Sequence, residues 1–193
     1  PLQILHLLEQ GSNIHATVTI PEGLNIEQIA VLLAKDGWID VPRFISLTRD
    51  QDFIRTLEID QPSLEGYLFP DTYQLTRGDV TEEDVLRMMT RRFARVWQEV
   101  TADGKPPMSR HQIVTLASIV EKETGAPEER PVIAQVFINR LARNMRLQSD
   151  PTVIYGIEDF DGDLTGARLQ PGAECRQIPE RHIVKSGCRG AEI

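Results

Sequence analysis

Two carboxylates at the end of an apolar segment are the side chains best placed for chemistry. Glu121 and Glu123 follow residues 113–120, which are apolar almost all round a helix. A helix of this kind is typical of the buried centre of a helical domain. A carboxyl group beside it tends to stay protonated near neutral pH. A protonated glutamate can give its proton to a glycosidic oxygen as the sugar–oxygen bond breaks.

The spacing of the two glutamates limits what they can do together. Side chains two positions apart on a helix point in different directions, so Glu121 and Glu123 cannot form a matched pair that faces one sugar. At most one of them is therefore the catalytic acid. The alternative interpretation is that both are solvated charges in the last helical turn, and the local pattern leaves this open.

A second candidate region lies at residues 65–73. Glu65, Tyr67, Asp71 and Tyr73 combine aromatic rings, which can stack on sugar rings, with carboxylates that can bind sugar hydroxyls. The alternative is a structural turn in which the rings are buried. The residue types alone are compatible with both interpretations.

Further polar side chains belong to the next expected helix, over 129–143. Asn139 and Arg140 could contribute to the same site, and Arg140 could equally form an ion pair with Glu128 or Glu129. The side chains expected to point inward from this helix are Val132, Val136, Phe137 and Leu141. Beyond it, Asp150 and the following proline are typical of a helix start, which predicts a short helix over 152–155.

Composition excludes several function classes. The chain has 193 residues and a net charge of −8, which argues against a nucleic-acid backbone as the main partner. Its four histidines and two cysteines show neither metal-ligand spacing nor a nucleophilic triad, and there is no glycine-rich phosphate loop. We therefore expect no metal and no cofactor. No apolar run approaches the ~20 residues that cross a bilayer.

The elements that must position these residues can be predicted from helix caps and apolar periodicity. We expect a strand over 16–20, helices from 26 and over 41–47, and long helices that open at Thr81 and Ser109. The methionine and aromatic side chains that repeat after Thr81 are interpreted as core.

Four stretches of the chain carry more specific motifs. They are Glu65-Gly-Tyr-Leu-Phe-Pro-Asp-Thr-Tyr73, Ala117-Ser-Ile-Val-Glu-Lys-Glu-Thr124, Val136-Phe-Ile-Asn-Arg-Leu141 and Met145-Arg-Leu-Gln-Ser-Asp-Pro-Thr-Val-Ile-Tyr-Gly156. In this order and with these spacings they resemble the MltG/YceG family of endolytic murein transglycosylases, over residues 17–165. The resemblance implies an α+β fold. It comprises a small LysM-like subdomain over 1–60, a mainly helical lysozyme-like catalytic domain over 61–165 and an atypical tail over 166–193.

The resemblance also implies roles for the candidate residues. It places the catalytic glutamate in Glu121-Lys-Glu-Thr124, and Glu123-Thr124 is the better match to the Glu-Ser pair that lytic transglycosylases carry after a buried helix. Glu123 is therefore predicted to be the general acid and base, with Glu121 in a supporting role. The residues predicted to bind substrate are Glu65, Tyr67, Asp71, Tyr73, Glu121, Asn139, Arg140, Gln148, Asp150, Thr152 and Tyr155.

The implied reaction cleaves the bond between N-acetylmuramic acid and N-acetylglucosamine without water. Glu123 would protonate the glycosidic oxygen and then take the proton of the muramic acid C6 hydroxyl, which closes a 1,6-anhydro ring and limits the length of nascent glycan strands. One carboxylate serves both steps, whereas hydrolytic glycosidases need two. Two alternatives stay open: a hydrolytic muramidase with Asp71 or Asp150 as second carboxylate, and a non-catalytic peptidoglycan-binding module.

The resemblance further implies a cellular setting. It implies a full-length protein at the inner membrane, anchored by a single N-terminal helix that this chain lacks, with a periplasmic catalytic part and peptidoglycan synthases as partners. The tail after about residue 166 lacks apolar periodicity, holds both cysteines and departs from the family pattern. We hypothesise that this C-terminus is frameshifted or truncated. Comparison of the coding sequence with a full-length relative tests this.

Overall fold

The structure, a computed structural model, describes residues 15–76, 80–104 and 106–155 and divides the chain into two compact units. Unit 1 spans Pro1–Pro107 and unit 2 spans Met108–Ile193. Helices predominate, with one small two-stranded sheet, as the predicted α+β class requires. Tail residues 156–193 lie outside the described residues, and the domain limits predicted at 60 and 165 stay predictions.

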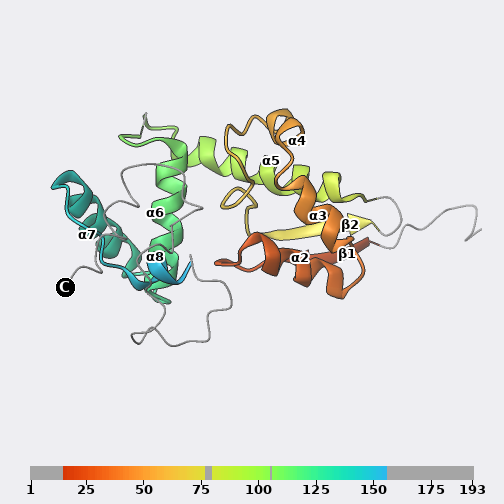
Figure 1. Cartoon of the computed structure of the whole chain (residues 1–193), viewed down its shortest axis with the longest axis horizontal. Coiled ribbons are helices and arrows are strands. Elements are labelled where there is room, and N and C mark those ends of the chain that lie inside the picture. The colour runs from red at the N-terminus through yellow and green to blue at the C-terminus, as the bar shows by residue number, and fades with distance from the viewer. Residues whose placement is uncertain (1–14, 77–79, 105, 156–193) are drawn as a thin grey trace, which may run out of the picture. The chain divides into compact units, whose positions relative to one another are not determined.

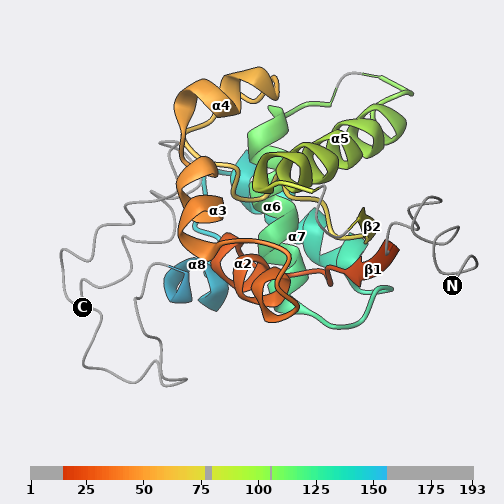
Figure 2. The same ribbon diagram turned by 90° about the vertical axis from the view of Figure 1, so that its right-hand side faces the viewer.

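Unit 1 begins with a strand that finds its partner far along the chain. Strand β1 (His15–Thr19) pairs antiparallel with β2 (Thr72–Thr76), in a register that sets Val18 opposite Tyr73. Figure 2 shows the two strands side by side. The first strand was predicted from its β-branched alternation. The second was missed, because residues 65–73 were considered only as a motif or a turn.

Four helices complete unit 1, and local side chains explain where each begins. They are α2 (Ile26–Lys35), α3 (Val41–Leu47), α4 (Gln51–Thr56) and α5 (Glu82–Val100). Asn25 and Thr81 cap α2 and α5 through reciprocal capping boxes, which satisfy backbone N–H groups that have no partner inside the helix. Three of these helices confirm the predicted starts, whereas α4 was not predicted.

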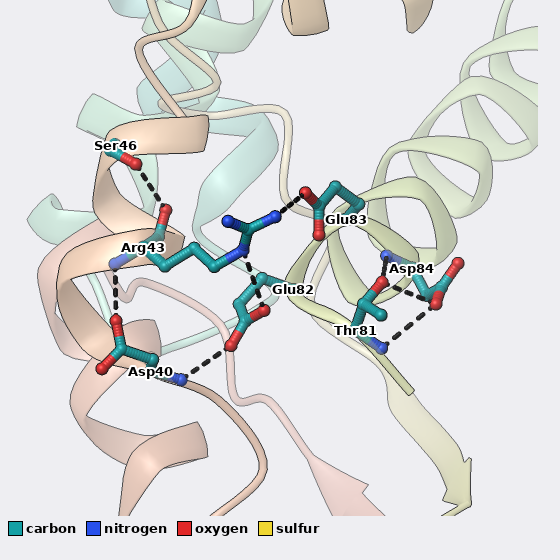
Figure 3. A network of polar contacts seen from close by, with 7 residues as sticks. All are labelled: Asp40, Arg43, Ser46, Thr81, Glu82, Glu83 and Asp84. Atoms are coloured by element: carbon teal, nitrogen blue, oxygen red, sulfur yellow. Dashed lines mark hydrogen bonds and ion pairs between the residues drawn. The ribbon is translucent and has the colours of Figure 1, made fainter. Parts of the chain in front are cut away.

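A polar network links α3 to the first turn of α5 (Figure 3). Arg43 Nε lies 3.4 Å from Glu82 Oε2, and its Nη2 lies 2.5 Å from Glu83 Oε1. The backbone N–H of Asp40 donates to Glu82 Oε1 at 2.8 Å. The carboxylates therefore complement the positive end of the α5 dipole and at the same time hold α3 in place.

The core of unit 1 forms between these helices and the strand pair. Side chains such as Phe44, Leu86 and Met89 are completely buried, and α3 packs against both α2 and α5 (Figures 1 and 2). Val85, Met89 and Phe93 confirm the core predicted from the apolar repeat of α5. Val100, in the last turn of the same helix, is 71% exposed. The apolar repeat therefore continues beyond the part of α5 that is buried.

Unit 2 consists, in its described part, of three helices. Helix α6 (Arg110–Glu123) begins at the predicted capping box of Ser109, and α7 (Arg130–Ala142) and α8 (Asp150–Ile154) both pack against it (Figure 1). Helix α8 begins at Asp150 itself, so this residue is helical and not the residue before the helix. Within the described residues, no helix has the length and apolar character needed to span a bilayer.

Candidate functional site

Helix α6 is apolar on one side and carries the candidate glutamates at its C-terminal end. Leu116, Ile119 and Val120 are buried in a cluster with Phe137 and Leu147. The prediction of a helix buried all round is wrong, since Ala117 and Ser118 are exposed. Leu116, Ile119 and Val120 lie three and four positions apart, so the buried residues share one face of α6.

The inward face of α7 also differs from the prediction. Phe137 and Leu141 contact the cluster as predicted, together with Ile133 and Ala134. Val132 and Val136, predicted to point inward, are 67% and 45% exposed. Positions 133, 137 and 141 share one helix face at four-residue spacing, and that face is the one that meets α6.

Glu121 is bound by an arginine. Arg130 Nη2, at the start of α7, lies 3.1 Å from Glu121 Oε2 and 3.2 Å from Glu121 Oε1, and both side chains are about one-third exposed. This ion pair joins the end of α6 to the start of α7. Glu121 is therefore engaged in holding two helices together.

Glu123 has a different partner. Its side chain is exposed, and its Oε1 accepts a hydrogen bond from the Oγ of Ser149, a residue that is 4% exposed and immediately precedes α8. Within residues 15–76, 80–104 and 106–155, Oε2 of Glu123 has no hydrogen-bond partner. One oxygen is thus bound by the protein, while the other has no such partner among these residues.

The segment that carries Ser149 leaves α7 through a well-defined turn. Asn144 adopts a left-handed conformation with φ 53°, its N–H donates to Leu141 O at 3.0 Å, and Met145 N–H donates to Arg140 O at 2.8 Å. This pair of bonds is the Schellman arrangement that ends many helices. The helix predicted over 129–143 thus ends within one residue of the expected position, at Ala142 with Arg143 as its C-cap.

Two further contacts hold residues 145–149. The Arg140 guanidinium donates from Nη1 to the carbonyls of Arg146, at 3.5 Å, and Leu147, and lies 3.4 Å from Gln148 Oε1. The alternative prediction, an Arg140 ion pair with Glu128 or Glu129, is not what the structure shows. Leu147 is 1% exposed and belongs to the apolar cluster. The segment is therefore anchored from both its polar and its apolar side.

The other predicted residues of unit 2 lie around this segment. Gln148, Asp150 and Tyr155 are exposed, whereas Thr152 is half-buried and donates from Oγ1 to Ser149 O at 2.6 Å. Asn139 is exposed on α7 and accepts a hydrogen bond from Gln135 at 3.0 Å. The structure thus places Gln148 and Asp150 next to the Ser149–Glu123 contact, one on each side of Ser149 in the chain.

Thr124, the residue paired with Glu123 in the motif, points elsewhere. Its Oγ1 donates to Glu129 Oε2 at 2.7 Å and accepts from the backbone N–H of Ala126 at 3.0 Å. These bonds close the short turn between α6 and α7. Thr124 therefore shapes the turn, and the hydroxyl that contacts Glu123 comes from Ser149.

In unit 1, the predicted residue Glu65 serves the start of α2. Its Oε2 accepts a hydrogen bond from the backbone N–H of Ile26 at 3.1 Å. Burial raises the pKa of Glu65, and the Ile26 N–H opposes this shift by stabilising the carboxylate. Tyr67 is 1% exposed and its ring meets Phe93 edge-on with centroids 5.0 Å apart, so it belongs to the core rather than to a surface.

Asp71 and Tyr73 belong to a small cluster with residues of α5 and of their own segment. Arg92 Nε lies 2.5 Å from Asp71 Oδ2, and its guanidinium carbon lies 5.5 Å from the ring centroid of Phe69. The backbone N–H of Thr72 and then Arg92 lower the pKa of Asp71. Tyr73 Oη donates to Phe69 O at 2.5 Å, and burial raises the pKa of this phenol.

Two residues that bind the candidate carboxylates were not predicted from the sequence, Ser149 at Glu123 and Arg92 at Asp71. Ser149 lies inside a quoted motif but was not singled out, and Arg92 lies outside all four motifs. The only signal for Ser149 was its place between Gln148 and Asp150, which were both predicted. Across the part of the chain that the structure describes, no three His, Cys, Asp or Glu side chains are grouped so as to hold a metal ion.

The chain is similar to proteins of one family. A model of the YceG-like family matches residues 1–176, which reaches into the tail set apart above on sequence. The endolytic murein transglycosylase of Bacillus subtilis (strain 168) is 32% identical over 170 residues, covering 79% of this chain and 47% of that protein. The endolytic murein transglycosylase of Streptococcus pneumoniae serotype 2 is 30% identical over 163 residues, covering 72% of this chain and 29% of that protein.

A solved structure extends the likeness to three dimensions. A putative yceG-like protein from Listeria monocytogenes matches with a TM-score of 0.71 at 29% identity, covering 96% of this chain and 67% of that one. The chain therefore spans about half or less of the length of the two curated relatives, and about two thirds of the chain in the solved structure.

Proposed function

Because the chain belongs to the YceG-like family, we propose that it is part of an endolytic murein transglycosylase that cleaves peptidoglycan glycan strands. Two curated relatives carry that name. Within this proposal, Glu123 is the general acid and base and the end of α6 is the catalytic centre.

One observation carries the assignment of Glu123. Of the two glutamates, Glu121 is tied to Arg130, whereas Glu123 is exposed and presents an oxygen without a hydrogen-bond partner among the described residues. A carboxyl group must be able to reach the proton it gives or takes within hydrogen-bond distance of a substrate atom. Glu123 meets this requirement, while Glu121 would first have to leave its arginine.

The proposed reaction needs that one carboxyl group in both of its forms. Protonated Glu123 gives its proton to the glycosidic oxygen, the bond to C1 of the muramic acid breaks, and positive charge develops at the ring oxygen and C1. The carboxylate of Glu123 then takes the proton of the C6 hydroxyl, whose oxygen bonds to C1. The products are a free sugar hydroxyl and a 1,6-anhydro end, and no water is consumed.

The hydrolytic alternative needs a second carboxylate across the bond. The Asp71 carboxylate is paired with Arg92 in unit 1. It would have to leave this ion pair before it could activate a water molecule. Asp150 is exposed and next in sequence to Ser149, so it is the candidate that this alternative would use. The non-catalytic alternative does not account for the exposed Glu123 side chain bound by Ser149.

Unit 1 is proposed to contribute to glycan binding. Phe69, Asp71 and Arg92 combine a half-buried ring with charged groups that can bind sugar hydroxyls. The LysM-like and lysozyme-like character of the subdomains, the inner-membrane location with the catalytic part in the periplasm, and partnership with peptidoglycan synthases are proposed with the family assignment.

The test is digestion of uncrosslinked glycan strands by the whole chain, followed by mass spectrometry of the fragments. Fragments that end in anhydro sugars, one water lighter than reducing ends, are the expected result. Reducing ends would support the hydrolytic alternative. Binding of the strands without cleavage would support the binding module.

A further inference from the structure

We infer that Ser149 is a positioning residue for the catalytic carboxyl group: its hydroxyl fixes Oε1 of Glu123 so that the proton transferred in catalysis resides on Oε2. The inference rests on the proposed function and concerns a residue for which the sequence predicted no role. Its starting point is the hydrogen bond from Ser149 Oγ to Glu123 Oε1.

Ser149 is buried and Glu123 is exposed, and this difference indicates which of the two residues orients the other. Ser149 is 4% exposed, so its hydroxyl has little access to water, whereas the glutamate side chain is exposed. An exposed glutamate can normally sample several side-chain rotamers. A hydroxyl held by its surroundings selects the rotamer that it can reach, so the buried partner orients the exposed one.

Ser149 can do this only if its own backbone is held, and the structure supplies three anchors. The Schellman turn fixes the exit from α7 at Asn144, the Arg140 guanidinium binds the carbonyls of Arg146 and Leu147, and the Leu147 side chain is buried in the apolar cluster. Figure 1 shows α7 and α8, which bound this segment, both lying against α6. Side chains with such a supporting shell keep the geometry that catalysis needs.

Backbone strain at the neighbouring residue points the same way. Gln148 has φ 53°, a left-handed conformation that non-glycine residues rarely adopt. A residue in this conformation persists where the surrounding structure enforces it, commonly at functional sites. Here the turn at Gln148 is what directs the following residue, Ser149, toward the end of α6.

The chemical consequence follows from the two forms of the carboxyl group. When Glu123 is an acid, Oε1 is its carbonyl oxygen and accepts the Ser149 hydrogen bond, so the acidic proton lies on Oε2. When Glu123 is a carboxylate, Ser149 continues to donate to Oε1, and Oε2 receives the proton from the sugar hydroxyl. The same hydrogen bond thus suits both steps and does not have to reverse between them.

The experiment compares Ser149→Ala and Ser149→Thr in the whole chain, with Ser118→Ala as matched control. Ser118 is exposed on α6, and its Oγ donates to the backbone carbonyl of Thr115. Cleavage of glycan strands by Ser149→Ala should fall about 10- to 100-fold in kcat, of the order found when the hydrogen-bond partner of a metal-ligating side chain is removed, with KM unchanged. Ser149→Thr, which keeps the hydroxyl, should restore most of the rate, and Ser118→Ala should match the parent chain.

A structural readout separates this inference from the proposed function. In crystal structures, we expect one Glu123 rotamer in the parent chain and several in Ser149→Ala. An unchanged single rotamer together with unchanged kcat in Ser149→Ala would overturn the inference, even if Glu123→Gln abolishes cleavage. Absence of cleavage by the parent chain would instead contradict the proposed function and leave the rotamer result to decide the positioning role.

A second variant covers the case in which Ser149→Ala fails to fold. Ser149→Cys keeps a side chain of similar size but has a weak donor. We expect its kcat to lie below that of Ser149→Thr. Equal rates for the cysteine and threonine variants would contradict a positioning role for the hydroxyl.

Discussion

The segment 65–73 and the end of α6 both carry carboxylates, but they use them differently. In the segment, Glu65 receives a backbone N–H of α2 and Asp71 is paired with Arg92, so both acids contribute to the fold of unit 1. At the end of α6, Glu121 does the same through Arg130, while Glu123 is held by a neutral hydroxyl and remains exposed. A full ion pair satisfies a carboxylate, whereas a single hydroxyl donor orients it and leaves its second oxygen available.

The largest effects are expected when the charges of Glu121 and Glu123 at the end of α6 are removed one at a time. Glu123→Gln should lower the cleavage rate about 10²- to 10⁴-fold, the usual contribution of a general acid–base group, because an amide cannot give or take the proton. Glu121→Gln should retain most of the rate and lose a modest part of the stability of unit 2. Kinetics on uncrosslinked glycan strands measure both, and an active Glu123→Gln beside an inactive Glu121→Gln would reverse our assignment.

The next effect concerns the apolar anchor of the Ser149 segment. Leu147→Ala should destabilise unit 2 by about 2–5 kcal/mol, because truncation of a buried leucine leaves a cavity. Amide hydrogen exchange in α6 and α7 measures this loss. Met145→Ala is the matched control in the same segment, since Met145 is 47% exposed and should change stability by no more than about 0.5 kcal/mol. Equal protection in the two variants would show that Leu147 is not an anchor.

A smaller, pH-dependent effect is expected at Glu65. Because burial raises its pKa in the folded state above the ordinary 4.5, the protonated form favours folding, and that contribution is lost as the pH rises through the raised value. Glu65→Gln removes this dependence. Both tryptophans, Trp38 and Trp97, lie in unit 1, so tryptophan fluorescence during unfolding reports on this unit. Identical pH profiles for parent and variant would contradict the raised pKa.

Asp71 should show the opposite sign in the same measurement. Its pKa is lowered from 3.8, so its contribution to stability is present above that value and is lost as the pH falls through the lowered one. Asp71→Asn should therefore flatten the acid side of the fluorescence profile, and only slightly, because the group is near solvent and its ion pair is screened. A gain of stability at neutral pH in Asp71→Asn would contradict this role.

Features that depend on neighbouring residues could be predicted from the sequence. The caps at Asn25, Thr81 and Ser109 and the helix over 41–47 follow from side chains within one turn of each start, and the structure confirms them. Such signals are local because a cap satisfies N–H groups only three positions away.

Features that depend on distant partners could not be predicted. Strand β2 forms only by pairing with β1, and Glu121 forms its ion pair with Arg130 of the next helix. Glu123 accepts its hydrogen bond from a serine 26 positions further along the chain. For Val132 and Val136 the sequence offers apolar residues on more than one side of α7, and only the position of α6 decides which side is buried. The same reason explains why the glutamates could be found from their motif while their different partners could not.

The pairing of β1 with β2 has a consequence for how unit 1 is made. His15 lies opposite Thr76, so β1 is synthesised roughly 60 residues before its partner β2. Closing so long a loop is slow. During that interval α2, α3 and α4 can form local contacts, but the β-branched strand is left with open hydrogen-bonding edges. Unit 1 is thus most exposed to mispairing from the synthesis of residues 15–19 until residues 72–76 have been made.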